Sequence, residues 1–73
     1  MGDDLQDKIN NWFTYHSPGT EDLTHYAALR ESAKAFAETI AKHTPTSADQ
    51  SAAIRLVREA VMTANAAVAC KGK

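Results

Sequence analysis

The apolar residues of the chain recur at helical spacing in its middle and last thirds. In the middle third, steps of three and four residues connect Tyr26, Leu29, Ala33, Phe36 and Ile40. In the last third, the same steps connect Ile54, Val57, Val61, Ala64 and Val68. Alternating steps of three and four form a heptad seam, along which one helix packs on another. The pattern therefore predicts two long helices that lie side by side.

Turn and capping residues mark where the expected helices begin and end. A shorter apolar stripe near the start of the chain stops before Pro18, because proline disfavours helix at the preceding residue. Thr20 is the expected N-cap of the second helix, and Ser47 and Gln50 form an S-x-x-Q capping box for the third. The third helix is expected to fray after Cys70. The expected helices span about residues 4–14, 20–43 and 47–70.

The expected third helix carries more apolar surface than one partner helix can cover. A second stripe runs beside its seam, at Ala53, Leu56, Ala60, Thr63 and Ala67. A helix that is apolar on two sides is usually buried on two sides. The sequence therefore predicts a single all-α domain over residues 1–73, with a short N-terminal helix across a long antiparallel hairpin, assembled as a homo-oligomer.

Length and composition favour association as the source of stability. A chain of 73 residues buries only about 60% of its unfolded surface, so a disulfide, a metal or association commonly supports it. Cys70 is the only cysteine, which excludes an internal disulfide and fits a reducing cytoplasm. The spacing of His16, His25 and His43 matches no metal-binding pattern. We expect no metal and no cofactor.

The charge balance argues against a polymeric nucleic-acid partner. Eight basic residues stand against nine acidic ones, for a net charge of −1. Binding to a polyphosphate backbone rests on many basic contacts, whereas a small anion needs only a few well-placed cations. No apolar run is long enough to span a membrane. The composition therefore leaves small phosphorylated ligands and other proteins as partners.

The sequence contains few of the residue combinations that catalytic sites require. Ser17 beside His16 is the only local pair of nucleophile and base, and neighbours in sequence seldom face each other productively. The three glycines are isolated from one another, so no glycine-rich phosphate loop exists. We therefore expect no enzymatic activity.

An aromatic segment precedes the first turn. Trp12 and Phe13 continue the apolar stripe of the first helix and are expected to anchor it to the hairpin. Tyr15 and His16 lie beyond that stripe, where a flat ring can stack on a nucleobase, worth about 1–3 kcal/mol per base. Arg30 could grip a phosphate with two parallel hydrogen bonds. A structural Tyr15 and an ordinary exposed Arg30 remain alternatives.

Four stretches of the chain resemble one small family of phage proteins. They are "FTYHSP", "YAALRESAKAFAETI", "SADQSAAIRLVREAV" and "MTANAAVA". These stretches resemble the helical-hairpin sponge proteins that counter CBASS immunity of bacteria and, in related forms, Thoeris immunity. The similarity runs from about Leu5 to Ala69.

The resemblance implies a binding protein without enzymatic activity. Members of that family sequester cyclic oligonucleotide second messengers, so that the immune effector is not activated, and other relatives take cyclic ADP-ribose variants. They form compact homohexamers with one pocket for cyclic dinucleotides and a separate pocket for cyclic trinucleotides. A hexamer is therefore the assembly that the resemblance implies here.

Site residues also follow from the resemblance. The cyclic dinucleotide would contact Tyr15, His16, Arg30 and Ser32, with Tyr15 as the base-stacking residue and Arg30 as the phosphate contact. Because a cyclic dinucleotide is nearly two-fold symmetric, a pocket on a dimer axis would supply Tyr15 and Arg30 twice. Candidates for the second pocket are Arg55, Arg58, Thr63 and Lys71. Asn65 is expected to be a buried amide that fixes helix packing.

The sequence thus predicts a phage anti-defence protein that acts in the cytoplasm of the infected bacterial host. It would bind cyclic dinucleotides without cleaving them, with cyclic trinucleotides as a further candidate ligand. Binding would block activation of the CBASS effector. The alternative is a small helical protein-binding module, such as a phage inhibitor or an antitoxin-like hairpin. That module would use the alanine-rich third helix as its contact face.

Overall fold

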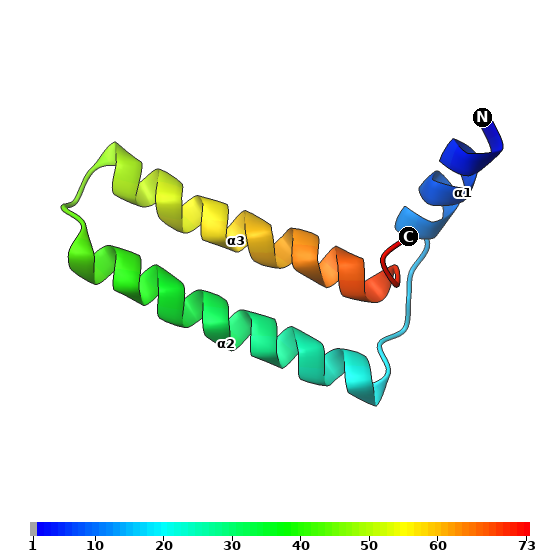
Figure 1. Ribbon diagram of the computed structural model, residues 1–73, viewed down its shortest axis with the longest axis horizontal. Helices are drawn as coiled ribbons and strands as arrows, with labels where there is room; N and C mark the ends of the chain where they lie inside the picture. The colour runs from blue at the N-terminus through cyan, green and yellow to red at the C-terminus, as the bar shows by residue number, and fades with distance from the viewer. Residues whose placement is uncertain (1) are drawn as a thin grey trace.

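The chain forms three helices and, within the described residues 2–73, no strand. In the computed structural model these are α1 (Gly2–Trp12), α2 (Thr20–His43) and α3 (Ala48–Ala69). Side chains are described from Asp4 onward. Figure 1 shows α2 and α3 antiparallel and side by side, with α1 beyond the open end of the hairpin. The all-helical class and the helical hairpin are therefore confirmed.

The heptad seams face each other in the hairpin, as the spacing predicts. The seam residues Leu29, Ala33, Ile40, Val57 and Val61 are half-buried between α2 and α3. Cys70, with 7% of its surface exposed, is the only buried residue in the described part of the chain. A single copy therefore has a packed seam but no enclosed core.

The first helix is placed differently from the expectation. It ends at Trp12 rather than near residue 14, and it projects away from the hairpin instead of lying across it (Figure 1). Phe13 is 84% exposed, so the predicted anchoring role of Phe13 is wrong for the single chain. Instead, α1 is held by hydrogen bonds to the residues that follow α3. The indole Nε1–H of Trp12 donates to the backbone oxygen of Lys73 at 2.8 Å.

The start of α2 is capped one residue earlier than expected. Gly19, with extended backbone, is the N-cap, and Thr20 is the first helical residue. The Asp22 carboxylate accepts the backbone N–H of Gly19 at 3.1 Å. An acceptor reaching back from the third helical position is half of a capping box, and its negative charge suits the helix N-terminus.

The N-terminus of α3 is capped by Ser47 as predicted, but the predicted capping box is incomplete. The Ser47 hydroxyl accepts the backbone N–H of Gln50 at 3.1 Å. The Gln50 side chain does not complete the box, but donates to the carbonyls of Ala41 and Thr44 at 3.3 and 3.1 Å. Gln50 therefore ties the end of α2 to the start of α3 and helps to close the hairpin.

Removal of the Ser47 hydroxyl should destabilise the hairpin. We expect Ser47→Ala to lower the free energy of unfolding by about 1 kcal/mol, because a helical N–H loses its acceptor. Thermal unfolding followed by circular dichroism at fixed protein concentration measures this change. Thr46→Ala, at the exposed neighbouring position, is the control. An equal loss in both variants would contradict the capping role.

The end of α3 is an ordered turn rather than a frayed end. Lys71 and Gly72 both have positive φ, at 58° and 75°. The N–H of Lys71 bonds to the Val68 carbonyl at 3.3 Å, and that of Gly72 bonds to the Ala67 carbonyl at 2.9 Å. These two bonds form a Schellman motif, in which the first left-handed position is usually glycine. The segment is called the Cys70–Lys73 turn below.

Candidate functional site

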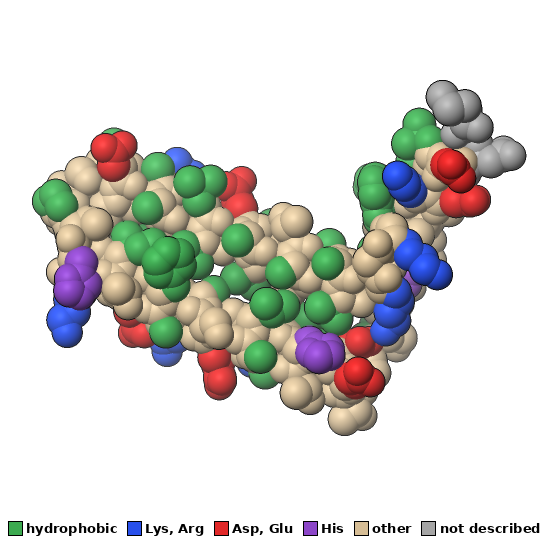
Figure 2. Space-filling view, in the orientation of Figure 1, with side chains coloured by type: hydrophobic (Ala, Val, Ile, Leu, Met, Phe, Trp, Pro, Cys, Tyr) green, Lys and Arg blue, Asp and Glu red, His purple; other side chains and the backbone are tan. Residues whose placement is uncertain are grey.

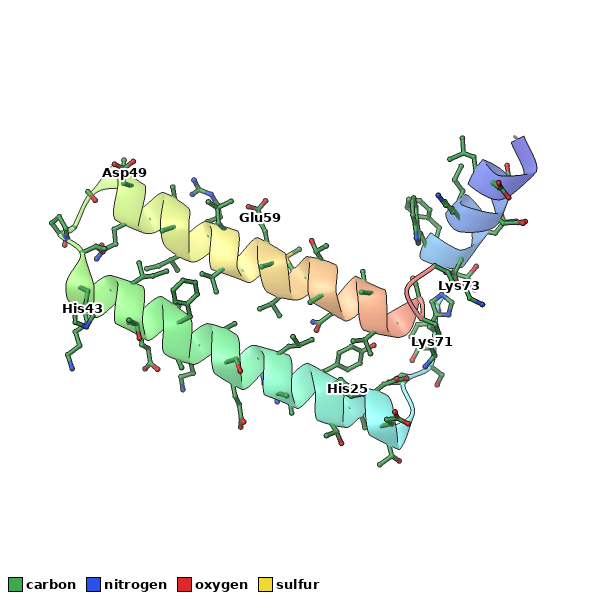
Figure 3. The ribbon with its side chains drawn as sticks, in the orientation of Figure 1. His25, His43, Asp49, Glu59, Lys71 and Lys73 are labelled. Atoms are coloured by element: carbon green, nitrogen blue, oxygen red, sulfur yellow. The ribbon has the colours of Figure 1, made fainter. Side chains whose placement is uncertain are left out.

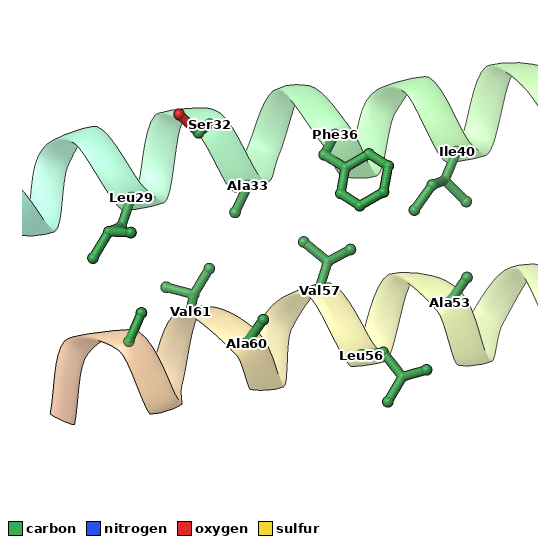
Figure 4. Close-up of a pocket in the computed structure, with 11 residues that line it drawn as sticks. Leu29, Ser32, Ala33, Phe36, Ile40, Ala53, Leu56, Val57, Ala60 and Val61 are labelled. Atoms are coloured by element: carbon green, nitrogen blue, oxygen red, sulfur yellow. The ribbon is translucent and has the colours of Figure 1, made fainter. Parts of the chain in front are cut away.

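An apolar groove runs along one side of the hairpin seam. It has a volume of about 660 Å³ and includes Phe36 and Ile40 of α2 and Leu56 and Ala60 of α3. Figure 4 shows Phe36 and Ile40 reaching toward α3. Ser32, a predicted ligand contact, is the one polar residue in its lining. The space-filling view in Figure 2 shows hydrophobic side chains gathered along the hairpin. This groove is better suited to pack against another apolar surface than to bind a phosphate.

A second groove carries basic residues. Arg30, Lys34 and Arg58 line it together with Ala37 and Ile54, and its volume is about 300 Å³. The exposed surface of its lining is almost entirely apolar, so the aliphatic stems of the three basic residues form its wall rather than their charged groups. At about 100° per residue, Arg30 and Lys34 lie on the other side of the seam from the apolar groove. None of the three cations forms an ion pair with a described carboxylate. We call this surface the basic groove.

The segment at 13–19, called the Tyr15 loop, joins α1 to α2. Tyr15 is 82% exposed. The ring of His16 is half-buried, and its Nε2 lies 2.6 Å from the backbone oxygen of Asn11. The hydroxyl of Thr14 donates to the carbonyl of Asn10. The loop therefore holds His16 by a backbone contact and leaves the Tyr15 ring free for a ligand or partner.

Lys71, a candidate for the second pocket, is engaged within the chain. Its ammonium lies 3.2 Å from the Asp22 carboxylate. The backbone N–H of Gly19 and the ammonium of Lys71 lower the pKa of Asp22 from its ordinary value of 3.8. Both contacts therefore favour the ionised form of the Asp22 carboxylate. Figure 3 shows Lys71 and Lys73 near one another, where the end of the chain meets α1.

The other candidates are dispersed in the single chain. Thr63 lines a cavity of about 380 Å³ with Trp12 and Cys70, where α1 meets α3. Arg55 is exposed on α3. The Oδ1 atom of Asn65 is shielded from solvent and accepts no hydrogen bond within the described chain. The structure therefore does not gather the four second-pocket candidates into one site of a single copy.

The sequence does not predict two groupings that the structure contains. The family resemblance assigns Arg30 and Arg58 to different pockets, yet both line the basic groove. Lys34 was not a candidate, although its position one turn after Arg30 is a signal that could have revealed it. The contact of Lys71 with Asp22 joins residues 49 positions apart and has no local signal.

Catalytic and metal-binding arrangements are not evident in the described residues. His16 contacts the Asn11 carbonyl, and no hydrogen bond joins it to Ser17. No group of three His, Cys, Asp or Glu side chains lies close enough together to hold a metal ion, within the part of the chain that is described. None of the three described helices combines the length and apolar character needed to cross a bilayer.

Fold and surfaces together define a small helical-hairpin protein with an apolar groove and an exposed aromatic loop. The chain belongs to the Acb2/Tad1 hairpin-domain family, whose model matches residues 5–69. This is a family of phage cyclic-oligonucleotide sponges directed against CBASS or Thoeris defence, and its members act as binding proteins rather than enzymes. No curated protein and no solved structure matches the chain. The family indicated by the four sequence stretches is confirmed.

Proposed function

We propose that this protein sequesters cyclic dinucleotide messengers in the cytoplasm of an infected bacterium and so prevents activation of a CBASS effector. The ligand is bound and remains intact. Family membership over residues 5–69 supports the class of function. The observation that supports the ligand is the free aromatic ring of Tyr15, which is 82% exposed on a loop of defined conformation.

A base-stacking role accounts for the exposure of Tyr15. An exposed aromatic ring offers a π-face to a nucleobase, and its stacking does not depend strongly on the identity of the base. His16 at the next position is fixed by the Asn11 carbonyl and could add a polar contact to the same base. The Tyr15 loop would thus supply one face of the pocket.

The phosphates would be held by Arg30. Ser32, the further polar contact, lines the apolar groove on the other side of the seam, so it would reach the same ligand only from a different copy. Arg30 shares the basic groove with Lys34 and Arg58, and these cations have no acidic partner among the described side chains. Three cations whose stems border the same groove could each turn toward a small anion with two phosphates. In a single copy Tyr15 lines none of the three grooves described above, which supports a pocket that is completed by a second copy.

A homo-oligomer follows from the same reasoning, and a hexamer is the form we propose from the family resemblance. Large apolar side chains are exposed in the single chain, including Phe36 at 58% and Leu56 at 63%. A two-fold axis beside the Tyr15 loop would bring two tyrosines and two arginines to one nearly symmetric ligand. A second pocket for cyclic trinucleotides would lie at another axis, with Arg55, Arg58, Thr63 and Lys71 as its candidate residues.

Calorimetry with a panel of cyclic di- and trinucleotides tests the proposal. We expect micromolar or tighter binding of at least one cyclic dinucleotide, with the ligand recovered unchanged after heat release from the protein. Absence of binding at high micromolar concentration would refute the sponge function. Recovery of linear products would instead indicate hydrolysis.

Loss of the Arg30 side chain should weaken binding strongly. A charge-assisted hydrogen bond contributes about 1.5–3 kcal/mol, so we expect Arg30→Ala to reduce affinity for a cyclic dinucleotide by about 10- to 150-fold. The dependence of affinity on salt should also become shallower, because one phosphate contact is gone. Lys42→Ala, which removes an exposed charge at the far end of α2, is the control. Equal losses in both variants would indicate a general charge effect.

A protein-binding module is the second candidate function, and the apolar groove favours it. Its length along the hairpin and the exposure of Phe36 and Leu56 suit an amphipathic helix from another protein. A protein of this kind would bind no cyclic nucleotide in the calorimetric panel. The same experiment therefore separates the two functions.

A further inference from the structure

The Cys70–Lys73 turn contacts the chain on both sides of the Tyr15 loop. Before the loop, the Asn11 side chain donates to the Cys70 carbonyl at 3.3 Å, and the Trp12 indole donates to the Lys73 carbonyl at 2.8 Å. After the loop, Lys71 pairs with Asp22 at 3.2 Å. A segment held at both ends by one rigid turn has fewer accessible conformations than a free loop.

The contacts on the two sides are linked through the loop itself. Asn11, which bonds to the turn, also provides the backbone oxygen that holds the His16 ring at 2.6 Å. Asp22, which pairs with Lys71, also accepts the N–H of Gly19, the last residue of the loop. Tyr15 therefore lies between Asn11 and Asp22 in the chain, and both of these residues contact the Cys70–Lys73 turn.

The identity of residue 71 is unusual for its backbone conformation. Lys71 occupies the left-handed position of the Schellman motif with φ of 58°, where glycine avoids a steric cost of roughly 1–2 kcal/mol. Lysine in place of glycine adds a long side chain whose ammonium reaches Asp22. The turn would form more readily with glycine, so the backbone alone does not explain the lysine.

We infer that Lys71 is a positioning residue, which fastens the Cys70–Lys73 turn to Asp22 and thereby fixes the Tyr15 loop for ligand. The expected effect of Lys71 on affinity for the cyclic dinucleotide rests on the proposed function. The ordering of the loop is a property of the protein itself. Lys71 acts through Asp22 and Gly19 and does not contact the cyclic dinucleotide.

Glycine substitution separates the ammonium from the backbone of the turn. Lys71→Gly suits the positive φ and removes the ammonium, whereas Lys73→Gly removes the same charge two residues later and keeps the carbonyl that Trp12 contacts. Lys71→Arg restores a cation. All three are made in the full chain, and light scattering establishes that each has the mass of the wild-type assembly.

Hydrogen exchange provides a readout that is independent of ligand. Trp12 is the only tryptophan, so its indole N–H gives one resolved NMR signal whose hydrogen exchange reports on the bond to Lys73. We expect Lys71→Gly to accelerate exchange of the Thr14 and Gly19 amides, which donate to Asn11 and Asp22, while the indole proton stays protected because the turn keeps its backbone bonds. The expected factor is about two to five, which corresponds to an exposed ion pair. Lys73→Gly and Lys71→Arg should stay near wild type.

Affinity for the cyclic dinucleotide identified by calorimetry should change in parallel. We expect Lys71→Gly to weaken binding by about two- to fivefold and Lys71→Arg to restore it. Unchanged exchange in Lys71→Gly, or equal acceleration in Lys73→Gly, overturns the inference. Weaker binding with unchanged exchange would assign Lys71 to the ligand pocket, and faster exchange with unchanged affinity would exclude a positioning role.

Failure of the proposed function has a different signature. If the wild type binds no cyclic nucleotide, the sponge function and the effect on affinity fall together. The exchange comparison between Lys71→Gly and Lys73→Gly still decides whether Lys71 orders the Tyr15 loop.

Discussion

Replacement of Tyr15 by alanine should weaken cyclic dinucleotide binding by about 5- to 150-fold for each ring that stacks on a base. This range corresponds to the 1–3 kcal/mol that one base–aromatic contact contributes. If the ligand lies on a two-fold axis, each pocket loses two rings, and the loss should approach or exceed the upper end. The thermal midpoint should change little, because Tyr15 is 82% exposed and supports no packing in the single chain.

Two control variants test whether the loss of affinity is due to the ring of Tyr15. Tyr15→Phe keeps the flat ring and should bind within a few fold of wild type, since stacking requires no hydroxyl. Phe13→Ala removes a ring of similar exposure from the same loop. Calorimetry on the three variants measures the effect. Wild-type affinity in Tyr15→Ala, or an equal loss in Phe13→Ala, would remove Tyr15 from the pocket.

Leu56→Lys should convert the assembly to smaller species. Leu56 is 63% exposed in the single chain and lies in the apolar groove, so a lysine there would cost little in a monomer. Against a second copy the same ammonium would be buried without a partner, a change that costs several kcal/mol. We expect a shift from a multiple of 7.9 kDa toward 7.9 kDa in light scattering.

Ala35→Lys is the matched control for this experiment. Ala35 is exposed on the outer side of α2, one turn from Glu31 and Glu38. A lysine at this position adds the same charge outside the groove. It should retain the wild-type mass. A wild-type protein that runs as a monodisperse species near 7.9 kDa would contradict the oligomer outright. A Leu56→Lys variant with unchanged mass would place the interface elsewhere.

The hairpin could be predicted from the sequence because its determinants are local and periodic. Steps of three and four residues set the faces of α2 and α3, and Ser47 marks the start of α3 through a bond that spans three residues. The position of α1 could not be predicted in the same way. It depends on bonds from Asn11 to Cys70 and from Trp12 to Lys73, which join residues 59 and 61 positions apart.

The candidate site could be predicted only in its parts. Tyr15 and Arg30 were identifiable as residue types that suit bases and phosphates, and their roles remain proposals. The basic groove joins Arg30 and Lys34 to Arg58 across the seam, and this depends on the register between α2 and α3. Heptad steps determine which faces meet but not the longitudinal offset of two helices, so the grouping emerged only from the structure.

The dimensions of the chain, 48 × 30 × 14 Å, describe an object one helix thick. Domains are ordinarily built from at least two packed layers around a core. In the proposed assembly, another copy supplies the second layer, and folding and association then form a single equilibrium governed by protein concentration. A messenger bound between copies would stabilise the assembled state and with it the folded chain. The signal that alerts the host would thus promote the folding of the protein that removes it.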